Sequence, residues 1–132
     1  MGTVALQGRL FSGQGYGTAF LSLPWVQSQI VEKLGFKPFP GTLNLHLTQE
    51  SAETRKNLIE TERAIMILPE KGFHCGLCYK VCIMDKIDGA IVIPQVPDYP
   101  KTLLEVIAPV DLRKTLELRE GDEVQLSVYL PA

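Results

Sequence analysis

Hydrophobic and polar positions alternate in several short segments of the chain. The clearest alternation runs over residues 124–130, where every second residue is Val or Leu. Because successive side chains of a β-strand point to opposite faces, this alternation predicts a strand with one buried face. Other short apolar segments predict further strands at residues 4–10, 19–23, 42–47, 64–68, 76–84, 89–93 and 103–107.

Helical signals are fewer. Pro24 suits the first turn of a helix, and Gly35 is a good stop for it. Residues 49–58 allow either a short exposed helix or a loop, and Pro109 can begin a short helix that runs to Leu116. The apolar side of the first helix is expected to carry Val26, Ile30, Val31 and Leu34.

The predicted elements are many short strands with two or three short helices. This combination favours a compact, mainly β barrel with helical plugs over a doubly wound sheet. The sequence has no repeated strand–helix units of about 30 residues, which are the usual setting of a dinucleotide-binding domain. With 132 residues, of which 45% are hydrophobic, the chain is expected to form one domain over residues 1–132.

Charge and hydropathy exclude some classes of partner. Lys and Arg total 13 against 15 Asp and Glu, so the net charge is −2 and no broad basic surface is available for nucleic acid. No apolar run approaches the roughly 20 residues that span a bilayer, and the N-terminus lacks a basic segment followed by an apolar stretch. We therefore expect a cytoplasmic protein with neither a nucleic-acid nor a membrane partner.

Three alternating glycines, Gly13, Gly15 and Gly17, form the first candidate site. Thr18 stands where a dinucleotide fingerprint needs Gly, and no Gly-Lys-Ser/Thr sequence follows for a P-loop. Glycines let backbone N–H groups come close to a phosphate, as in the glycine loop between two strands of protein kinases. The segment therefore predicts either a phosphate-binding loop between strands or a structural turn.

The segment 42–47 carries the second candidate site. If Leu43 and Leu45 face a core, Thr42 and Asn44 share the opposite face, about 7 Å apart at two strand rises. A hydroxyl and an amide oxygen at that spacing can hold one hard cation, and Mg²⁺ on nucleotide phosphates fits well. The alternative is the solvent-facing polar side of an edge strand.

Glu105 stands within the apolar segment 103–107. A buried carboxylate must be paired, protonated or functional, whereas a carboxylate on an exposed strand face needs no such explanation. Within reach of a substrate hydroxyl, this carboxylate can orient the hydroxyl or accept its proton during phosphoryl transfer.

Three cysteines, Cys75, Cys78 and Cys82, follow His74 closely. Their odd number argues against a secreted disulfide framework. The cluster could ligate zinc or an iron–sulfur cluster, although only one close pair of cysteines is present. In the alternative, Cys78 and Cys82 share one face of a hairpin strand as small buried hydrophobic residues.

Several segments together resemble the CTP-dependent riboflavin kinases typical of archaea. The similarity runs from about Gly8 to Val128 and is carried by the order and spacing of residues 12–17, 20–24, 34–36, 41–45, 87–92, 105–109 and 112–113. It implies a compact six-stranded cradle-loop β-barrel with a few short helices. It also implies an enzyme that uses Mg²⁺ to transfer the γ-phosphate of CTP to the 5′-hydroxyl of riboflavin, giving FMN and CDP.

The resemblance implies roles for individual residues. Glu105 and Asn44 would be catalytic, Thr42 and Asn44 would bind magnesium, and Glu105 would also lie on the flavin side. The nucleotide contacts would come from Gly13, Gln14, Gly15, Tyr16, Gly17, Thr18, Val110, Asp111, Leu112 and Arg113. The substrates would be riboflavin and CTP, and we expect a monomer.

The chain departs from the family pattern before Glu105. There the family often carries a threonine next to a tyrosine that touches the flavin, whereas this chain reads Pro97-Asp98-Tyr99-Pro100-Lys101-Thr102. Thr102 is taken as the substitute for the flavin-binding threonine.

The sequence also allows three other functions. A non-catalytic sensor module of the same fold would bind flavin or nucleotide without forming FMN. The strand–turn–strand pattern of residues 116–128 also resembles small barrel proteins that dimerise and bind DNA, but the charge balance argues against this function. A metalloprotein built on the three cysteines would contain stoichiometric zinc or iron.

Overall fold

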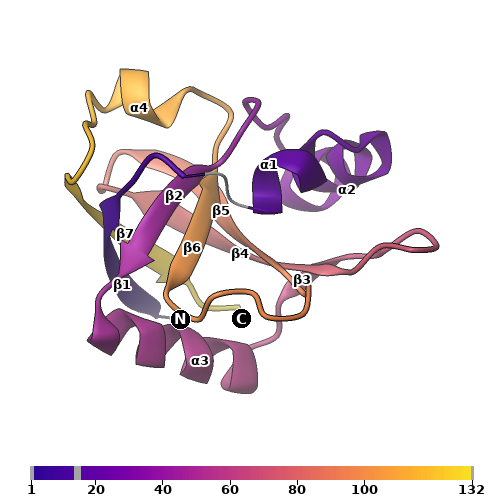
Figure 1. Cartoon of the computed structure of the whole chain (residues 1–132), viewed down its shortest axis with the longest axis horizontal. Helices are drawn as coiled ribbons and strands as arrows, with labels where there is room; N and C mark the ends of the chain where they lie inside the picture. The colour runs from indigo at the N-terminus through magenta and orange to yellow at the C-terminus, as the bar shows by residue number, and fades with distance from the viewer. Residues whose placement is uncertain (1, 14–15, 132) are drawn as a thin grey trace.

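The computed structural model of the chain describes residues 2–13 and 16–131. Its strands are β1 (Thr3–Leu10), β2 (Leu43–Leu47), β3 (Ile65–Ile67), β4 (Gly76–Ile83), β5 (Ile87–Pro94), β6 (Leu103–Ile107) and β7 (Glu123–Tyr129). Six of them form one antiparallel barrel in the order β4-β5-β6-β2-β1-β7, which closes where β7 pairs with β4; β3 adds to β4 outside the ring (Figure 1). The prediction of a mainly β, six-stranded barrel with a few short helices is confirmed.

The inside of the barrel is filled by every second residue of its strands. On β2, for example, Leu43, Leu45 and Leu47 point inward and are all less than a tenth exposed. Val124, Leu126 and Val128 of β7 belong to the same core, as their alternation predicted. Closure of the barrel gives each of these six strands a paired neighbour on both sides, so none of them is an edge strand of the ring.

In the part of the chain that the structure describes, four helices surround the barrel: α1 (Tyr16–Leu21), α2 (Pro24–Leu34), α3 (Gln49–Thr61) and α4 (Leu112–Thr115). Figure 1 shows α3 at one end of the barrel, α4 at the opposite end, and α1 and α2 together on one side. The helices within residues 2–13 and 16–131 are too short or too polar to cross a membrane.

Helix α2 begins and ends at the residues that its sequence predicted. It begins at Pro24 and ends at Gly35, whose φ of 85° lets its N–H bond the carbonyls of Ile30 and Val31. The predicted apolar side is correct for Val26, Ile30 and Leu34, which are buried, but wrong for Val31, which is 49% exposed. Val31 lies just beside that face of the helix, where its side chain does not reach the barrel.

A second core lies between the helices and the outside of the barrel. Leu21 of α1 and the buried face of α2 pack there against Cys78 of β4 and Val92 of β5. Two faces of β4 and β5 are therefore buried, one inside the barrel and one beneath the helices. This explains why β5 reads as a continuous apolar run, with six consecutive buried residues from Gly89 to Pro94.

The strand predicted at residues 19–23 is wrong, because this segment belongs mostly to helix α1. Short apolar runs fit a strand or a buried helix equally well by periodicity. Here the helical form places Leu21 in the outer core and sets the Phe20 ring edge-on to Trp25, with ring centroids 6.0 Å apart. Tertiary packing therefore decides the conformation of this segment.

Two other helical predictions are refined by the structure. Residues 49–58 lie within α3, so the helix and not the loop is correct there; Thr48 caps it by accepting a hydrogen bond from the Ser51 N–H. The helix expected from Pro109 begins only at Leu112, because Asp111 is its N-cap and accepts from the Lys114 N–H.

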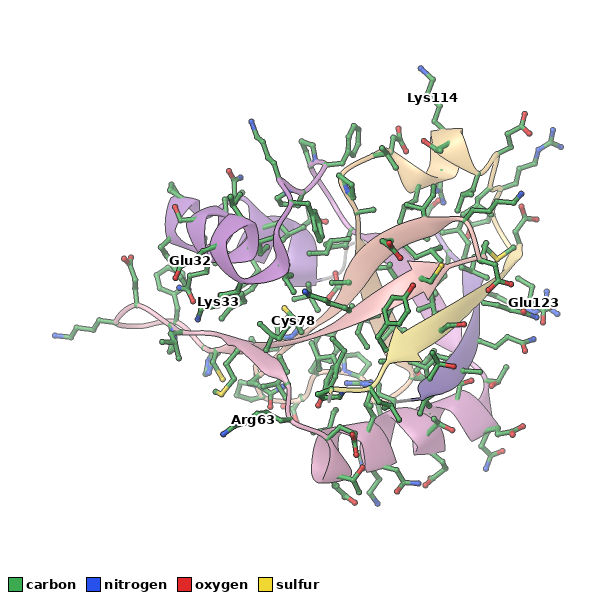
Figure 2. All side chains as sticks on the ribbon, turned by 180° about the vertical axis from the view of Figure 1, so that it is seen from behind. Glu32, Lys33, Arg63, Cys78, Lys114 and Glu123 are labelled. Carbon is green, nitrogen blue, oxygen red and sulfur yellow. The ribbon has the colours of Figure 1, made fainter. Side chains whose placement is uncertain are left out.

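The three cysteines lie on or next to β4 and do not converge. Within residues 2–13 and 16–131, no three His, Cys, Asp or Glu side chains are close enough together to hold a metal ion. Cys78 is fully buried in the outer core, and Cys75 and Cys82 are half-buried free thiols. Figure 2 shows Cys78 and Lys33 on the side of the barrel that the helices cover.

Burial makes Cys78 the least reactive thiol in the folded protein. Desolvation raises the pKa of Cys78 from 9.0 to about 12, with a smaller opposing effect of Lys33. That shift leaves about 10³-fold less thiolate at a given pH, and the thiolate is the reactive form. At pH 8 we expect iodoacetamide to modify Cys75 and Cys82 first, and Cys78 only after unfolding in urea. Peptide mass spectrometry checks this, and rapid labelling of Cys78 in folded protein would contradict it.

Candidate active site

Strands β2 and β6 bring two of the predicted site residues side by side. The two strands are antiparallel neighbours, and Asn44 lies directly opposite Glu105 in their register. Because Leu43 and Leu45 fill the barrel, Thr42 and Asn44 lie on the outer face, as the alternation predicted. Strand β2 is flanked by β1 and β6, so the alternative of an edge strand is wrong.

Glu105 is a buried carboxylate with three hydrogen-bond donors. Its side chain is 0% exposed, so the alternative of an exposed strand face is also wrong. Its Oε1 accepts from the Gly17 N–H at 2.8 Å and from the Thr42 hydroxyl at 2.8 Å. Its Oε2 accepts from the Tyr99 hydroxyl at 2.6 Å. Three separate parts of the chain therefore hold both carboxylate oxygens in place.

Asn44 presents a buried amide oxygen. Its Nδ2 donates to the Gly13 carbonyl at 2.9 Å, which fixes the amide, because a flipped amide would place two oxygens together. Among the described residues, no donor reaches its Oδ1, and the side chain is only 6% exposed. A buried acceptor without a donor costs about 1–3 kcal/mol, so this oxygen is ready for a ligand that attracts electron pairs.

Thr42 offers a second oxygen beside Asn44. Since the Thr42 hydroxyl gives its proton to Glu105, the lone pairs of its oxygen remain for a cation. Hydroxyl and amide oxygens are ligands that Mg²⁺ accepts, together with phosphate oxygens and water. The residues present thus fit a hard divalent cation.

A cavity of about 500 Å³ opens beside these residues. It is lined by three segments that are distant in the sequence, namely residues 10–13, 39–44 and 110–113. Val106 of β6 and Ala108, which follows that strand, complete the lining. The fold therefore brings Gly13, Thr42 and Asn44 together with the predicted nucleotide segment Val110–Arg113. Its volume lies in the range of small-molecule sites.

Arg113 ties two walls of this cavity together. Its Nη2 donates to the Ser12 hydroxyl at 2.8 Å and lies 3.5 Å from the Glu120 carboxylate. Ser12 in turn donates its hydroxyl and its N–H to Glu120. These Ser12 hydrogen bonds, and more weakly Arg113, hold the pKa of Glu120 below its ordinary value. The carboxylate is therefore charged at neutral pH and keeps the cluster together.

The glycine segment is placed differently from the predicted loop between two strands. It leads from β1 into helix α1, which begins at Tyr16. Gly13 lines the cavity, whereas the Gly17 N–H bonds Glu105 and Thr18 is an exposed residue of α1. Gln14 and Gly15, which were also predicted to contact the nucleotide, lie outside the described residues.

Thr102 does not join the Glu105 cluster. It is exposed, and its carbonyl accepts the Leu47 N–H at 2.7 Å. Tyr99, for which no role was predicted, provides the hydroxyl that binds Glu105. The sequence held a signal for Tyr99, because this residue stands in a proline-bounded turn six residues before Glu105. Only the path of the turn in the structure shows that the Tyr99 ring lies against β6.

Gly17 has no room for a side chain. A Cβ at this position would lie 2.7 Å from Glu105 Oε1 and 2.8 Å from Thr42 Cγ2. We expect Gly17→Ala to displace the carboxylate, to lower stability by about 1–3 kcal/mol through overpacking, and to reduce any activity that depends on Glu105. Urea unfolding measures the stability. Gly2→Ala is the control, because its Cβ would meet only Leu130 at an ordinary 3.8 Å; equal stability of the two variants would contradict the crowding.

Comparisons with known proteins agree with this arrangement. The family model CTP-dep_RFKase, described as a domain of unknown function (DUF120), matches residues 10–128. A riboflavin kinase of Archaeoglobus fulgidus is 44% identical over 98% of this chain and 56% of its own length. For riboflavin kinases of Methanococcoides burtonii and Ignicoccus hospitalis the identities are 42% and 40%, over 95% and 96% of this chain and 57% and 72% of theirs.

The chain thus spans little more than half the length of the first two of these relatives. The family match covers all the segments that build the cavity and the Glu105 cluster, from residue 10 to residue 128. The chain belongs to the CTP-dependent riboflavin kinase family.

Proposed function

We propose that this protein is a CTP-dependent riboflavin kinase, which transfers the γ-phosphate of CTP to the 5′-hydroxyl of riboflavin. The observation that carries the proposal is that Thr42 and Asn44 line one wall of the 500 Å³ cavity, with Glu105 directly behind them, bonded to the Thr42 hydroxyl and opposite Asn44 in the strand register. Phosphoryl transfer requires oxygen ligands for a metal, donors for the phosphates and an oriented hydroxyl. The same barrel contributes all three, so we propose a single domain that acts as a monomer.

The nucleotide occupies the cavity in this proposal. The backbone around Gly13 can come close to the phosphates because glycine has no side chain. Val110–Arg113 forms the opposite wall, where backbone groups can recognise the base, and Phe39 and Val110 offer partly exposed apolar surface to it. Arg113 holds this wall to Ser12.

Phosphoryl transfer in this family implies a metal ion, and we propose magnesium. Thr42 Oγ1 and Asn44 Oδ1 would hold it, since the first keeps its lone pairs and the second has no donor among the described residues. The bound ion would supply positive charge that offsets the negative charge developing on the phosphate oxygens. The hydrogen bond to Gly13 keeps the Asn44 oxygen oriented for that purpose.

Glu105 acts on the riboflavin hydroxyl in this proposal. Its carboxylate is held by Gly17, Thr42 and Tyr99, so the position of each oxygen is set before the substrate arrives. One of these donors yields its place to the incoming hydroxyl, which Glu105 orients and whose proton it can accept. A loose transition state requires little basicity, so orientation supplies most of the effect.

The test is FMN formation by purified protein with riboflavin and magnesium, mixed in parallel with CTP, ATP, GTP or UTP. Chromatography with fluorescence detection separates FMN from riboflavin. FMN with CTP supports the proposal, and FMN only with another nucleotide keeps the reaction but overturns the donor. Flavin or CTP binding without FMN, from protein with a cooperative unfolding transition, would replace the kinase by a non-catalytic sensor.

A further inference from the structure

Arg55 is a buried arginine at the end of the barrel opposite α4. It lies on α3, is only 7% exposed, and directs its guanidinium at the turn that precedes β6. Its Nη1 donates to the carbonyls of Pro100, Lys101 and Leu103 at 3.1, 2.7 and 3.1 Å. One nitrogen of Arg55 therefore binds three carbonyls, in this turn and at the start of β6.

The same guanidinium lies over the ring of Tyr99. The distance from Arg55 Cζ to the ring centroid is 5.5 Å, within the range of a cation–π interaction. The Tyr99 hydroxyl, at the far end of the ring, donates to Glu105 at 2.6 Å. Arg55 thus contacts both the backbone of the turn and the side chain that the turn carries toward Glu105.

A turn of this kind does not require a buried charge. The hydrogen bond from Leu103 N–H to the Pro100 carbonyl already closes it, and the hydrogen bond from Leu47 N–H to the Thr102 carbonyl joins it to β2. Desolvation lowers the pKa of Arg55, which means that burial of the cation is costly. In addition, no acceptor among the described residues reaches its Nε. The guanidinium is therefore not needed to close the turn, and its further contact is the Tyr99 ring.

We infer that Arg55 is a positioning residue, which fixes Tyr99 and thereby orients the Glu105 carboxylate toward the riboflavin hydroxyl. This inference rests on the proposed function. It extends the machinery beyond the cavity, to a helix at the other end of the barrel. It also predicts which substrate is affected. Arg55 acts on the use of riboflavin and not on that of the nucleotide, because neither Arg55 nor Tyr99 lines the cavity.

The kinetic test compares Arg55→Lys with the exposed control Arg63→Lys, which removes the same planar group from the surface just beyond α3 (Figure 2). A lysine keeps the charge but not the planar guanidinium geometry. We expect kcat/KM for riboflavin to fall about tenfold or more in Arg55→Lys, as for loss of a charge-assisted hydrogen bond, with KM for CTP within about twofold of wild type. Equal losses for both substrates would overturn the inference.

A double-mutant cycle with Tyr99→Phe separates positioning from general stability. If Arg55 acts through the Tyr99 hydroxyl, the two effects on kcat/KM for riboflavin overlap, and Arg55→Lys adds little in the Tyr99→Phe background. Multiplicative effects would show that Arg55 acts elsewhere. All assays are run below the unfolding temperature of the least stable variant, and Arg55→Lys is used because an uncharged residue could prevent folding.

NMR of protein labelled at the tyrosine Cζ carbon tests the Arg55–Tyr99 contact without measuring activity. It therefore separates this inference from the proposed function. Tyr99 is assigned as the signal that disappears in Tyr99→Phe. We expect its shift to change in Arg55→Lys more than those of the other three tyrosines. A changed Tyr99 signal in a protein that forms no FMN would leave the Arg55–Tyr99 contact intact but remove the catalytic role; an unchanged signal would overturn the inference in an active enzyme.

Discussion

Asn44→Ala is expected to abolish most of the turnover while leaving a cooperative thermal transition. The substitution removes one of two proposed oxygen ligands for magnesium, and loss of a preorganised electrostatic contact typically costs about 10²–10³-fold in kcat. Stability should change by only about 1 kcal/mol, because the variant loses the hydrogen bond to Gly13 but also removes a buried oxygen without a donor.

The measurement is FMN formation at a series of magnesium concentrations, beside thermal unfolding followed by circular dichroism. Asn57→Ala is the matched control, since Asn57 is exposed on α3 and the hydrogen bond that it accepts from the Thr61 hydroxyl uses its backbone carbonyl, which the substitution keeps. A shift of the magnesium dependence to higher concentration is expected for Asn44→Ala alone. Wild-type turnover of this variant at limiting magnesium would remove the proposed role of Asn44.

Glu105→Gln is expected to have the largest effect on the chemical step, a loss of about 10²–10⁴-fold if the carboxylate accepts the proton. The variant should fold. Its amide oxygen can accept from Gly17 and Thr42, and its amide nitrogen can donate to the Tyr99 oxygen in place of accepting from it. Glu105→Ala, by contrast, leaves three donors without their acceptor and should be destabilised by several kcal/mol, at about 1–3 kcal/mol for each buried donor.

Single-turnover FMN formation and urea unfolding distinguish these two effects. Glu123→Gln serves as the control, because Glu123 is exposed at the start of β7 (Figure 2). A smaller loss in Glu105→Gln, near tenfold, would indicate that Glu105 mainly orients the hydroxyl. Unchanged turnover in a folded Glu105→Gln protein would be incompatible with either role.

The positions of the strands could be predicted because the barrel interior is apolar, so buried and exposed residues alternate along the strands. Leu43, Leu45 and Leu47 alternate with Thr42, Asn44 and His46, and the burial of one set commits the other to the outer face. The same reasoning explains why β7 was predicted closely from its alternation. Where both sides of a segment are covered, or where it is very short, periodicity carries less information, and the segment 19–23 was assigned to a strand although its first three residues belong to α1.

The candidate site divides in the same way. The outward position of Thr42 and Asn44 followed from the strand period alone, and the nucleotide segment Val110–Arg113 was named only through family resemblance. That these two segments line one cavity with Gly13 depends on the order of strands in the barrel. No local pattern encodes that order.

By itself the sequence determined the elements with one apolar face, the mainly β fold class and the family, and it named candidate residues for binding phosphate and metal. Tertiary structure alone decided that Glu105 is buried, that Gly17, Thr42 and Tyr99 surround it, and that Arg55 reaches Tyr99 from α3. The physical reason is range. Periodicity and capping act between residues a few positions apart, whereas Gly17 and Thr42 meet Glu105 across 88 and 63 positions, through the closure of the barrel.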